Sequence, residues 1–319
     1  MLRISFGVGD LMLKLEYNDY WFNYCFEIDP QKIKTLIKED YILSQGLKIH
    51  LDIYDDKEKP FKGNVIFLHG TSVYSRFYAE FLYNLFNKGY RVIAPDMMGH
   101  GLSEGIRGHF TMNQFEKIVY DVHSYVIENY GNKNFLMGSS LGGINTLYSV
   151  AYDNRFNGAI CHNVAIFNEK AYKKIIKLRG ILRLLIHLIP IAAKIAPKLK
   201  ISTTLYLDFE NLAKTEKVIE RINILLKDSL ISLKYTFTAL RTQMKDPLPK
   251  PIEEIDVPIM IINGDEDILF SIEYMKEIYN RLICKNKSLE ILKDASHLIF
   301  QENIQEVLTR IIPWLEKIN

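Results

Sequence analysis

Short runs of apolar residues alternate with longer stretches of helical period along most of the chain. The runs at 64–70, 90–96, 134–140, 156–166 and 257–267 are dominated by apolar residues, and most end in polar residues or glycine. Continuous apolar strands that alternate with helices are typical of a parallel sheet covered on both faces. The pattern therefore predicts an α/β fold, with a ligand site at the carboxyl ends of the strands.

The alternation stops near residue 167 and resumes after Pro251. The intervening segment has helical patterns and no convincing strand. We therefore expect an α/β core formed by residues 38–166 and 251–319, with an inserted helical cap formed by residues 167–250. Residues 1–37, which include a cluster of aromatic residues, are expected to form an N-terminal extension that packs on the body.

Composition excludes several classes of protein. The 319 residues are 48% hydrophobic and 24% charged, which excludes a disordered or low-complexity chain. A formal net charge of +2 argues against binding of nucleic acid along the whole chain. Three widely spaced cysteines without a C-x-x-C pair, and a charged N-terminal segment without an export signal, predict reduced thiols in a cytoplasmic protein.

One motif places a serine at a sharp turn. Gly138-Ser139-Ser140-Leu141-Gly142 fits G-x-S-x-G and lies where an apolar strand gives way to a helical pattern. Glycines on either side of such a turn let strand and helix approach each other without a Cβ clash. Ser140, at the middle position, is therefore the candidate nucleophile, whereas Ser139 is interpreted as structural.

A serine hydroxyl becomes a good nucleophile only when a neighbouring base takes its proton. His297, near the end of the chain, is the candidate base. Asp267, in the acidic turn after the 257–264 strand, is the candidate carboxylate that orients it, and Asp294 is the alternative. The order Ser140, Asp267, His297 is the one that α/β-hydrolases show.

Five motifs then occur in a familiar order: LHGTS (68–72), PDMMGHGLSEG (95–105) followed by RGH (107–109), GSSLGG (138–143), INGDED (262–267) and ASH (295–297). From about residue 38 to 319 the sequence resembles the α/β-hydrolase superfamily, and within it the monoacylglycerol lipase and lysophospholipase branch. The resemblance implies a mostly parallel eight-stranded sheet flanked by helices, with an inserted helical cap. It also implies an oxyanion hole made by the backbone N–H groups of Thr71 and Leu141. The Thr71 side chain would either narrow the acyl pocket or add a hydroxyl donor.

The other histidines are interpreted as structural. His69 and His100 are expected to brace loops, whereas Arg107 and His109 either border the pocket or lie in an ordinary surface loop. No acid, cysteine or second histidine stands at ligand spacing from the remaining histidines, which are His50, His123, His162 and His187. Dinucleotide and P-loop motifs are also missing, so we expect neither a metal nor a cofactor.

The cap carries a strongly basic segment. Between residues 169 and 200, nine Lys or Arg residues and a single acid surround apolar residues at helical spacing. Such a segment either rests on an anionic membrane surface or packs its apolar face on the protein, with the lysines in solvent. In both cases an apolar cap over the serine favours a substrate with an acyl chain.

Together these features predict a serine hydrolase that cleaves carboxylic esters through an acyl-enzyme on Ser140. Its expected substrates are monoacylglycerols, lysophospholipids or similar single-chain lipids. The same residues are compatible with an acyltransferase, a thioesterase or a peptidase. A ligand-binding protein that retains the hydrolase shape without turnover is an alternative of another class.

Overall fold

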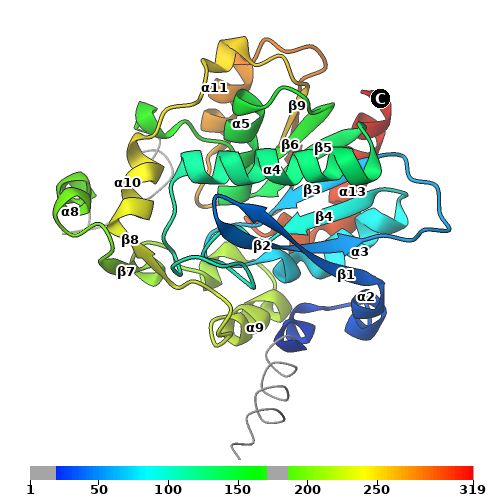
Figure 1. The fold of residues 1–319 in the computed structure, drawn as a ribbon, viewed down its shortest axis with the longest axis horizontal. Helices are drawn as coiled ribbons and strands as arrows, with labels where there is room; N and C mark the ends of the chain where they lie inside the picture. Colours follow the sequence, from blue (N-terminus) through cyan, green and yellow to red (C-terminus); the bar gives the residue numbers. More distant parts are fainter. Residues whose placement is uncertain (1–18, 171–185, 319) are drawn as a thin grey trace, which may run out of the picture.

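The computed structural model describes residues 19–170 and 186–318. Eight strands form one sheet in the order β1-β2-β4-β3-β5-β6-β9-β10 (Figure 1). The strands are β1 (Ile37–Ser44), β2 (Leu47–Tyr54), β3 (Asn64–Leu68), β4 (Arg91–Pro95), β5 (Asn134–Ser139), β6 (Gly158–His162), β9 (Ile259–Gly264) and β10 (Ser288–Leu292). All pairings from β4 to β10 are parallel, and only β1–β2 and β2–β4 are antiparallel. The eight-stranded, mostly parallel sheet is thus confirmed.

Helices cover both faces of the sheet. The side chains of β3 alternate: Ile66 and Leu68 pack on one face, and Val65 and Phe67 on the other. The first face is covered by α4 (Met112–Tyr130), α5 (Leu141–Tyr152) and α11 (Ile272–Arg281). The second is covered by α3 (Ala79–Asn87), α12 (Ile299–Glu302) and α13 (Ile304–Lys317). This double covering explains why the central strands are apolar throughout.

Between β6 and β9 the chain leaves the sheet. We propose that residues 167–250 form the cap, of which 171–185 lie outside the described residues. Its elements are η3 (Phe167–Glu169), η4 (Ile186–Leu188), α8 (Ile189–Ile195), β7 (Lys200–Ser202), η5 (Thr203–Leu205), η6 (Glu210–Leu212), α9 (Glu216–Leu225), β8 (Lys234–Thr236) and α10 (Phe237–Lys245); η7 (Ile252–Glu254) follows. β7 pairs antiparallel with β8. The expectation of a cap without strands was wrong here, because three-residue strands are too short to show a period of two in the sequence.

The N-terminal extension contacts the cap as well as the body. It contains η1 (Tyr20–Tyr24) and α2 (Pro30–Leu36), and residues 1–18 lie outside the described residues. Tyr24 Oη donates to Asp228 (2.6 Å), and Tyr20 Oη donates to the carbonyl of Ile224 (3.1 Å). The carboxylate of Glu80 on α3 accepts two backbone N–H bonds from residues 26 and 27. The extension therefore joins α9 of the cap to α3 of the core. None of the described helices is long and apolar enough to span a bilayer.

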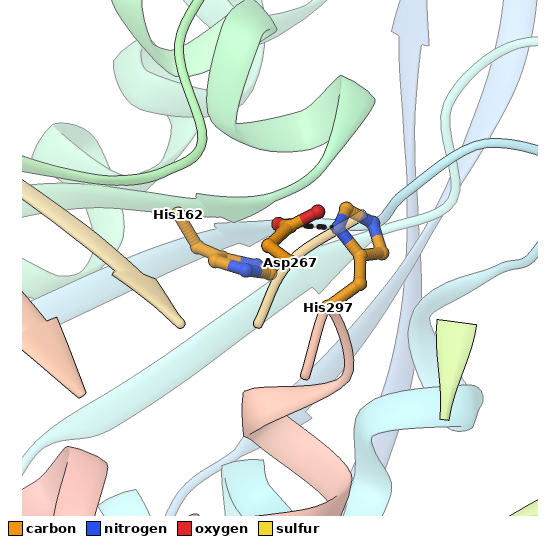
Figure 2. Close-up of side chains that lie close together, drawn as sticks. All are labelled: His162, Asp267 and His297. Atoms are coloured by element: carbon orange, nitrogen blue, oxygen red, sulfur yellow. Dashed lines mark hydrogen bonds and ion pairs between the residues drawn. The ribbon is translucent and has the colours of Figure 1, made fainter. Parts of the chain in front are cut away.

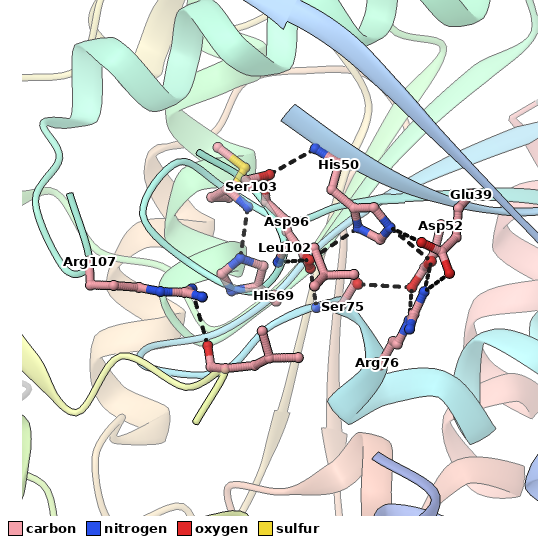
Figure 3. A network of polar contacts seen from close by, with 12 residues as sticks. Glu39, His50, Asp52, His69, Ser75, Arg76, Asp96, Leu102, Ser103 and Arg107 are labelled. Carbon is pink, nitrogen blue, oxygen red and sulfur yellow. Dashed lines mark hydrogen bonds and ion pairs between the residues drawn. The ribbon is translucent and has the colours of Figure 1, made fainter. Parts of the chain in front are cut away.

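A mostly buried network of charges ties β1, β2, the 3-10 helix η2 (Ser75–Tyr78) and the turn after β4 together (Figure 3). His50 donates from Nδ1 to Asp96 (3.1 Å) and from Nε2 to Glu39 (3.3 Å). Arg76 donates twice to Asp52 (2.9 Å each) and contacts Glu39 (2.8 Å). Burial would lower the pKa of His50, but Asp52 and the bonds to Asp96 and Glu39 raise that pKa to about 10. His50 is therefore a buried cation at neutral pH.

The same network fixes the turn of the PDMMGHG motif. Asp96 accepts the N–H groups of Ser75 (2.9 Å) and Leu102 (2.8 Å) in addition to the bond from His50. Gly101 has φ +50°, and a Cβ there would overlap the Asp96 carboxylate. These contacts give Asp96 and Gly101 a structural role in the turn.

This arrangement predicts that alkaline pH destabilises the protein through His50. A histidine whose pKa is raised on folding contributes stability that is complete below its unfolded pKa of about 6.5. That contribution is lost as the pH rises through the folded pKa of about 10. We expect the melting temperature to fall between pH 7 and 10.5 by about 3 °C more in the wild type than in His50→Gln. Thermal unfolding across this range measures the difference, and parallel curves for the two proteins would contradict the prediction.

Candidate active site

Ser140 occupies a strained turn between β5 and α5. Its φ of 57° and ψ of −118° lie in a region that residues other than glycine rarely adopt, at a cost of about 1–3 kcal/mol. A Cβ on Gly138 would overlap the carbonyl of Gly142, and one on Gly142 would overlap the carbonyl of Leu68. The glycines of the motif are thus required by close backbone approach. The turn projects Ser140 from the carboxyl end of the central strand β5.

Asp267 and His297 meet beyond the ends of β9 and β10. Nδ1 of His297 donates to Asp267 Oδ2 at 2.8 Å (Figure 2). The other carboxylate oxygen accepts the N–H groups of Leu269 (2.8 Å) and Phe270 (3.1 Å). The ring of Phe270 lies nearly parallel to the imidazole of His297, with centroids 5.9 Å apart. These contacts hold the imidazole in one orientation, with its Nδ1 proton on the side of Asp267.

The carboxylate of Asp267 is charged throughout the neutral range. Burial would raise the pKa of Asp267, but His297 and the backbone donor at Leu269 lower that pKa to about 2. The alternative acid, Asp294, is 69% exposed, and its carboxylate contacts Lys293 at 4.0 Å. The structure therefore places Asp267, and not Asp294, against the imidazole.

The turn at residues 69–71 packs on the serine. A Cβ built on Gly70 would lie 3.3 Å from Cβ of Ser140. The backbone N–H groups of Thr71 and Leu141 donate to no acceptor within residues 19–170 and 186–318. Two unpaired N–H groups beside a serine are available as donors to a ligand oxygen.

One cavity joins these groups. Ser140, His297, Gly70 and Thr71 line it together, and its other described walls are mostly apolar. The apolar lining residues are Val73, Phe77, Leu207, Phe209, Leu212, Ile222, Leu225, Leu269 and Leu298. Five of these nine come from the cap. The free space is only about 40 Å³, whereas pockets that hold organic ligands enclose roughly 300–1,000 Å³.

The serine hydroxyl and the imidazole line this cavity without a hydrogen bond between them in the structure. Catalytic hydrogen bonds are often long in ligand-free enzymes and shorten when the substrate binds. The arrangement is therefore suited to nucleophilic attack by Ser140 with His297 as base, once a substrate draws the two side chains together.

His69, which the sequence predicts to brace a loop, links two loops in the structure. Nε2 of His69 accepts the N–H of Met97 (3.0 Å), and its Nδ1 bonds the carbonyl of Gly70 (2.9 Å).

His109 bonds Thr236 of β8 (3.0 Å), and Arg107 donates to the carbonyl of Leu230 (3.3 Å). Arg107 and His109 thus contact the cap and do not line the described walls of the cavity.

Two residues at the end of β6 were missed by sequence reasoning. Asn163, with φ +69°, donates from Nδ2 to Asp267 Oδ2 (3.0 Å). His162 lies on the other side of Asp267 from His297 (Figure 2), and its Nδ1 bonds Ser139 Oγ (3.0 Å). Burial, followed by the charge of His297, lowers the pKa of His162 to about 3, so its ring is neutral. Their only signal in the sequence is their position at the carboxyl end of an apolar strand.

The structure also places acids against His50 and His162. Potential metal ligands lie together in two described groups: His162, Asp267 and His297, and Glu39, His50 and Asp52. In the first group Asp267 and His297 are bonded to each other, and in the second a guanidinium already contacts both carboxylates. We assign no metal to either group.

Comparisons with known proteins show that this chain is similar to hydrolases. Residues 59–304 match the Hydrolase_4 family, described as serine aminopeptidase, S33. A crystal structure of a monoacylglycerol lipase from Paleococcus ferrophilus superposes with a TM-score of 0.69 at 25% identity, covering 85% of this chain and 99% of that one. Phospholipase YtpA of Bacillus subtilis is 24% identical over 253 residues, which are 76% of this chain and 90% of that protein.

A third relative is much longer. An uncharacterised abhydrolase domain-containing protein of Dictyostelium discoideum is 23% identical over 274 residues, or 84% of this chain. The matched region spans only 28% of the length of that protein.

Proposed function

The chain belongs to the Hydrolase_4 (serine aminopeptidase S33) family, and on this premise we propose that it is a carboxylic ester hydrolase that acts through an acyl-enzyme on Ser140. One observation carries the proposal. A strained serine and a histidine bonded to a buried carboxylate line the same apolar cavity, beside two free backbone donors. These are the parts that acyl transfer through a serine requires.

In the proposed reaction Ser140 Oγ attacks the ester carbonyl while Nε2 of His297 takes its proton. The N–H groups of Thr71 and Leu141 stabilise the negative charge that develops on the carbonyl oxygen. His297 then donates the proton to the departing alcohol, which leaves the acyl group on Ser140. A water molecule, deprotonated by the same histidine, releases the acid. Asp267 stabilises the imidazolium at each step.

The cavity supports a lipid substrate. Its apolar walls fit an acyl chain, and the names of the relatives above include a monoacylglycerol lipase and a phospholipase. We therefore propose single-chain lipids such as monoacylglycerols or lysophospholipids. Because the free space is about 40 Å³, cap side chains such as Leu207 and Leu212 have to move before a chain enters.

The family description also names an aminopeptidase, which would have to bind a substrate ammonium group. A buried cation needs a paired anion, yet no Asp or Glu is among the described lining residues. The geometry therefore favours an uncharged acyl chain over a peptide N-terminus.

The experiment combines labelling with a panel of substrates. A fluorophosphonate probe should label Ser140, as identified by peptide mass spectrometry. Hydrolysis rates should rise with acyl length across p-nitrophenyl esters and monoacylglycerols, and fluorogenic amino-acid amides should remain uncleaved. Product analysis with added alcohols separates hydrolysis from acyl transfer, since a transferase forms a new ester at low alcohol concentration. Folded protein that fails to react with the probe would contradict the proposal and favour a non-catalytic binding protein.

We also propose that the cap contacts an anionic membrane surface. The part of the basic segment at 171–185 lies outside the described residues, but α8 in the described part has no buried residue. Leu188 is 54% exposed and Ile195 is 80% exposed. Lys194, Lys198 and Lys200 occur in the same stretch. Each lysine near anionic headgroups contributes about 1 kcal/mol, so this face is suited to a peripheral contact.

Co-sedimentation with phosphatidylglycerol vesicles tests this contact. Ile195→Glu should lower the bound fraction several-fold, because a charge replaces an apolar side chain that would enter the interface. Ile283→Glu, at a residue that is 66% exposed but lies far from the cap in sequence, is the matched control and should bind like the wild type. Equal binding by all three proteins would contradict a contact through α8.

A further inference from the structure

Residues of the cap hold the turn that carries a proposed oxyanion donor. Ser72 follows Thr71, is fully buried and has φ +69°. Its N–H donates to Tyr235 Oη (2.8 Å), its carbonyl accepts from the N–H of Ser232 (2.7 Å), and its Oγ donates to Thr203 Oγ1 (3.1 Å). All three partners lie more than 130 residues further along the chain, in the cap.

The hydrogen bonds around Tyr235 admit one arrangement of protons. Burial lowers the pKa of His100 to about 3, so its ring is neutral, with one donor and one acceptor nitrogen. Nδ1 of His100 donates to the carbonyl of Met98 (3.1 Å), which leaves Nε2 as an acceptor. Tyr235 Oη already accepts from Ser72, so its own proton goes to His100 Nε2 (2.9 Å). Each buried polar atom in this chain of bonds has a partner.

The position of the Tyr235 phenol is fixed by the core. The N–H of Thr236 donates to the carbonyl of Gly108 (3.0 Å), and a Cβ on Gly108 would overlap the backbone of β8. The Tyr235 ring packs edge-to-face on Phe110 (centroids 5.1 Å) and on His100 (5.6 Å). A buried phenol held on several sides is a rigid acceptor for the Ser72 amide.

We propose that Tyr235 is a positioning residue that orients the Thr71 amide toward the oxyanion. Full turnover therefore requires that the cap is packed on the core. The role rests on the proposed function. An oxyanion donor must lie about 2.7–3.1 Å from the oxygen it stabilises, and loss of one such donor lowers kcat about 10²–10³-fold. The peptide of Thr71 and that of Ser72 share one turn, so release of the Ser72 N–H tilts the preceding N–H away from the oxygen.

Tyr235→Phe tests the proposal, with Tyr148→Phe as the matched control. Tyr148 is also fully buried; its Oη accepts the N–H of Phe167 (2.9 Å) and donates to the carbonyl of Asp246 (2.9 Å). Each variant removes two hydrogen bonds of a buried phenol, so both should lower the melting temperature similarly. For p-nitrophenyl butyrate, Tyr235→Phe should lower kcat about 10- to 100-fold with KM within about threefold, whereas Tyr148→Phe should stay within about threefold of the wild type. Affinity for an alkyl boronic acid, which mimics the tetrahedral adduct, should fall in Tyr235→Phe by the same factor as kcat.

Hydrogen–deuterium exchange of residues 68–74 gives a readout that needs no activity. The segment should exchange at least about tenfold faster in Tyr235→Phe than in the wild type and stay unchanged in Tyr148→Phe. Unchanged exchange in Tyr235→Phe, or faster exchange with unchanged kcat, would overturn the positioning role. Ester hydrolysis by Ser140→Ala at the wild-type rate would instead refute the proposed function. Accelerated exchange in Tyr235→Phe would in that case still show that the cap holds this turn in place.

If Tyr235→Phe does not fold, a second variant tests the same proposal. Thr203→Val removes the acceptor of the Ser72 hydroxyl with little change of volume. It should change kcat, KM and exchange in the same direction, with a decrease in kcat of about three- to tenfold. Wild-type kcat and exchange in a folded Thr203→Val protein would overturn the proposal.

Discussion

Replacement of Ser140 by alanine is expected to lower kcat for p-nitrophenyl esters by at least about 10⁴-fold. The variant retains the cavity and both free amides but has no nucleophile, so no acyl-enzyme forms. The hydroxyl makes no hydrogen bond within the described residues, and alanine at φ 57° is as strained as serine. The melting temperature should therefore stay within about 2 °C of the wild type. Steady-state kinetics and thermal unfolding of the same preparation measure both quantities.

Ser149→Ala is the matched control for this variant. Ser149 lies on the same helix, α5, is buried, and bonds Asn145 (3.3 Å) away from the cavity. Its loss should leave kcat within about threefold of the wild type. Hydrolysis by Ser140→Ala at more than about a hundredth of the wild-type rate would rule out Ser140 as the nucleophile.

Replacement of Asp267 by asparagine should lower kcat about 10³- to 10⁴-fold. The uncharged amide no longer stabilises the imidazolium, and the tautomer of His297 that serves as base is no longer favoured. The N–H groups of Leu269 and Phe270 still find an acceptor in the asparagine oxygen, so the loop should keep its shape. Because the pKa of Asp267 is held near 2, no assay between pH 5 and 9 would neutralise the wild-type carboxylate.

Asp294→Asn is the control for this substitution. Asp294 is exposed and only three residues from His297, so it is the acid that sequence proximity favours. Its replacement should change kcat by less than about threefold. A decrease smaller than tenfold in Asp267→Asn would show that another acid orients the imidazole.

Much of the fold could be predicted from the sequence because its central strands are buried on both faces. Apolar runs at β3, β4, β5, β6 and β9 gave their approximate positions. The strands β7 and β8 could not be found in this way, because three residues are too few to show a hydrophobic period. β8 also packs on the core loop at Gly108, a contact between segments far apart in sequence.

The candidate site likewise has a part that the sequence could predict and a part that depends on the tertiary structure. Ser140 could be placed in a strained turn from the sequence because such a turn needs glycines at fixed spacing, and this requirement is local. The choice of Asp267 over the other acids, and the contribution of Asn163 to its environment, depend on how the ends of β6, β9 and β10 lie side by side. No local pattern records that distance.

The sequence by itself thus determined the class of fold, and it predicted the order of serine, acid and base and an insertion with an apolar and basic character. Only the tertiary structure decided which residues of the proposed cap line the cavity at Ser140. Tyr235 and Ser72 are 163 positions apart and meet through a single buried hydrogen bond. Such a contact is set by the packing of whole elements against each other, and the residues next to either partner in sequence carry no trace of it.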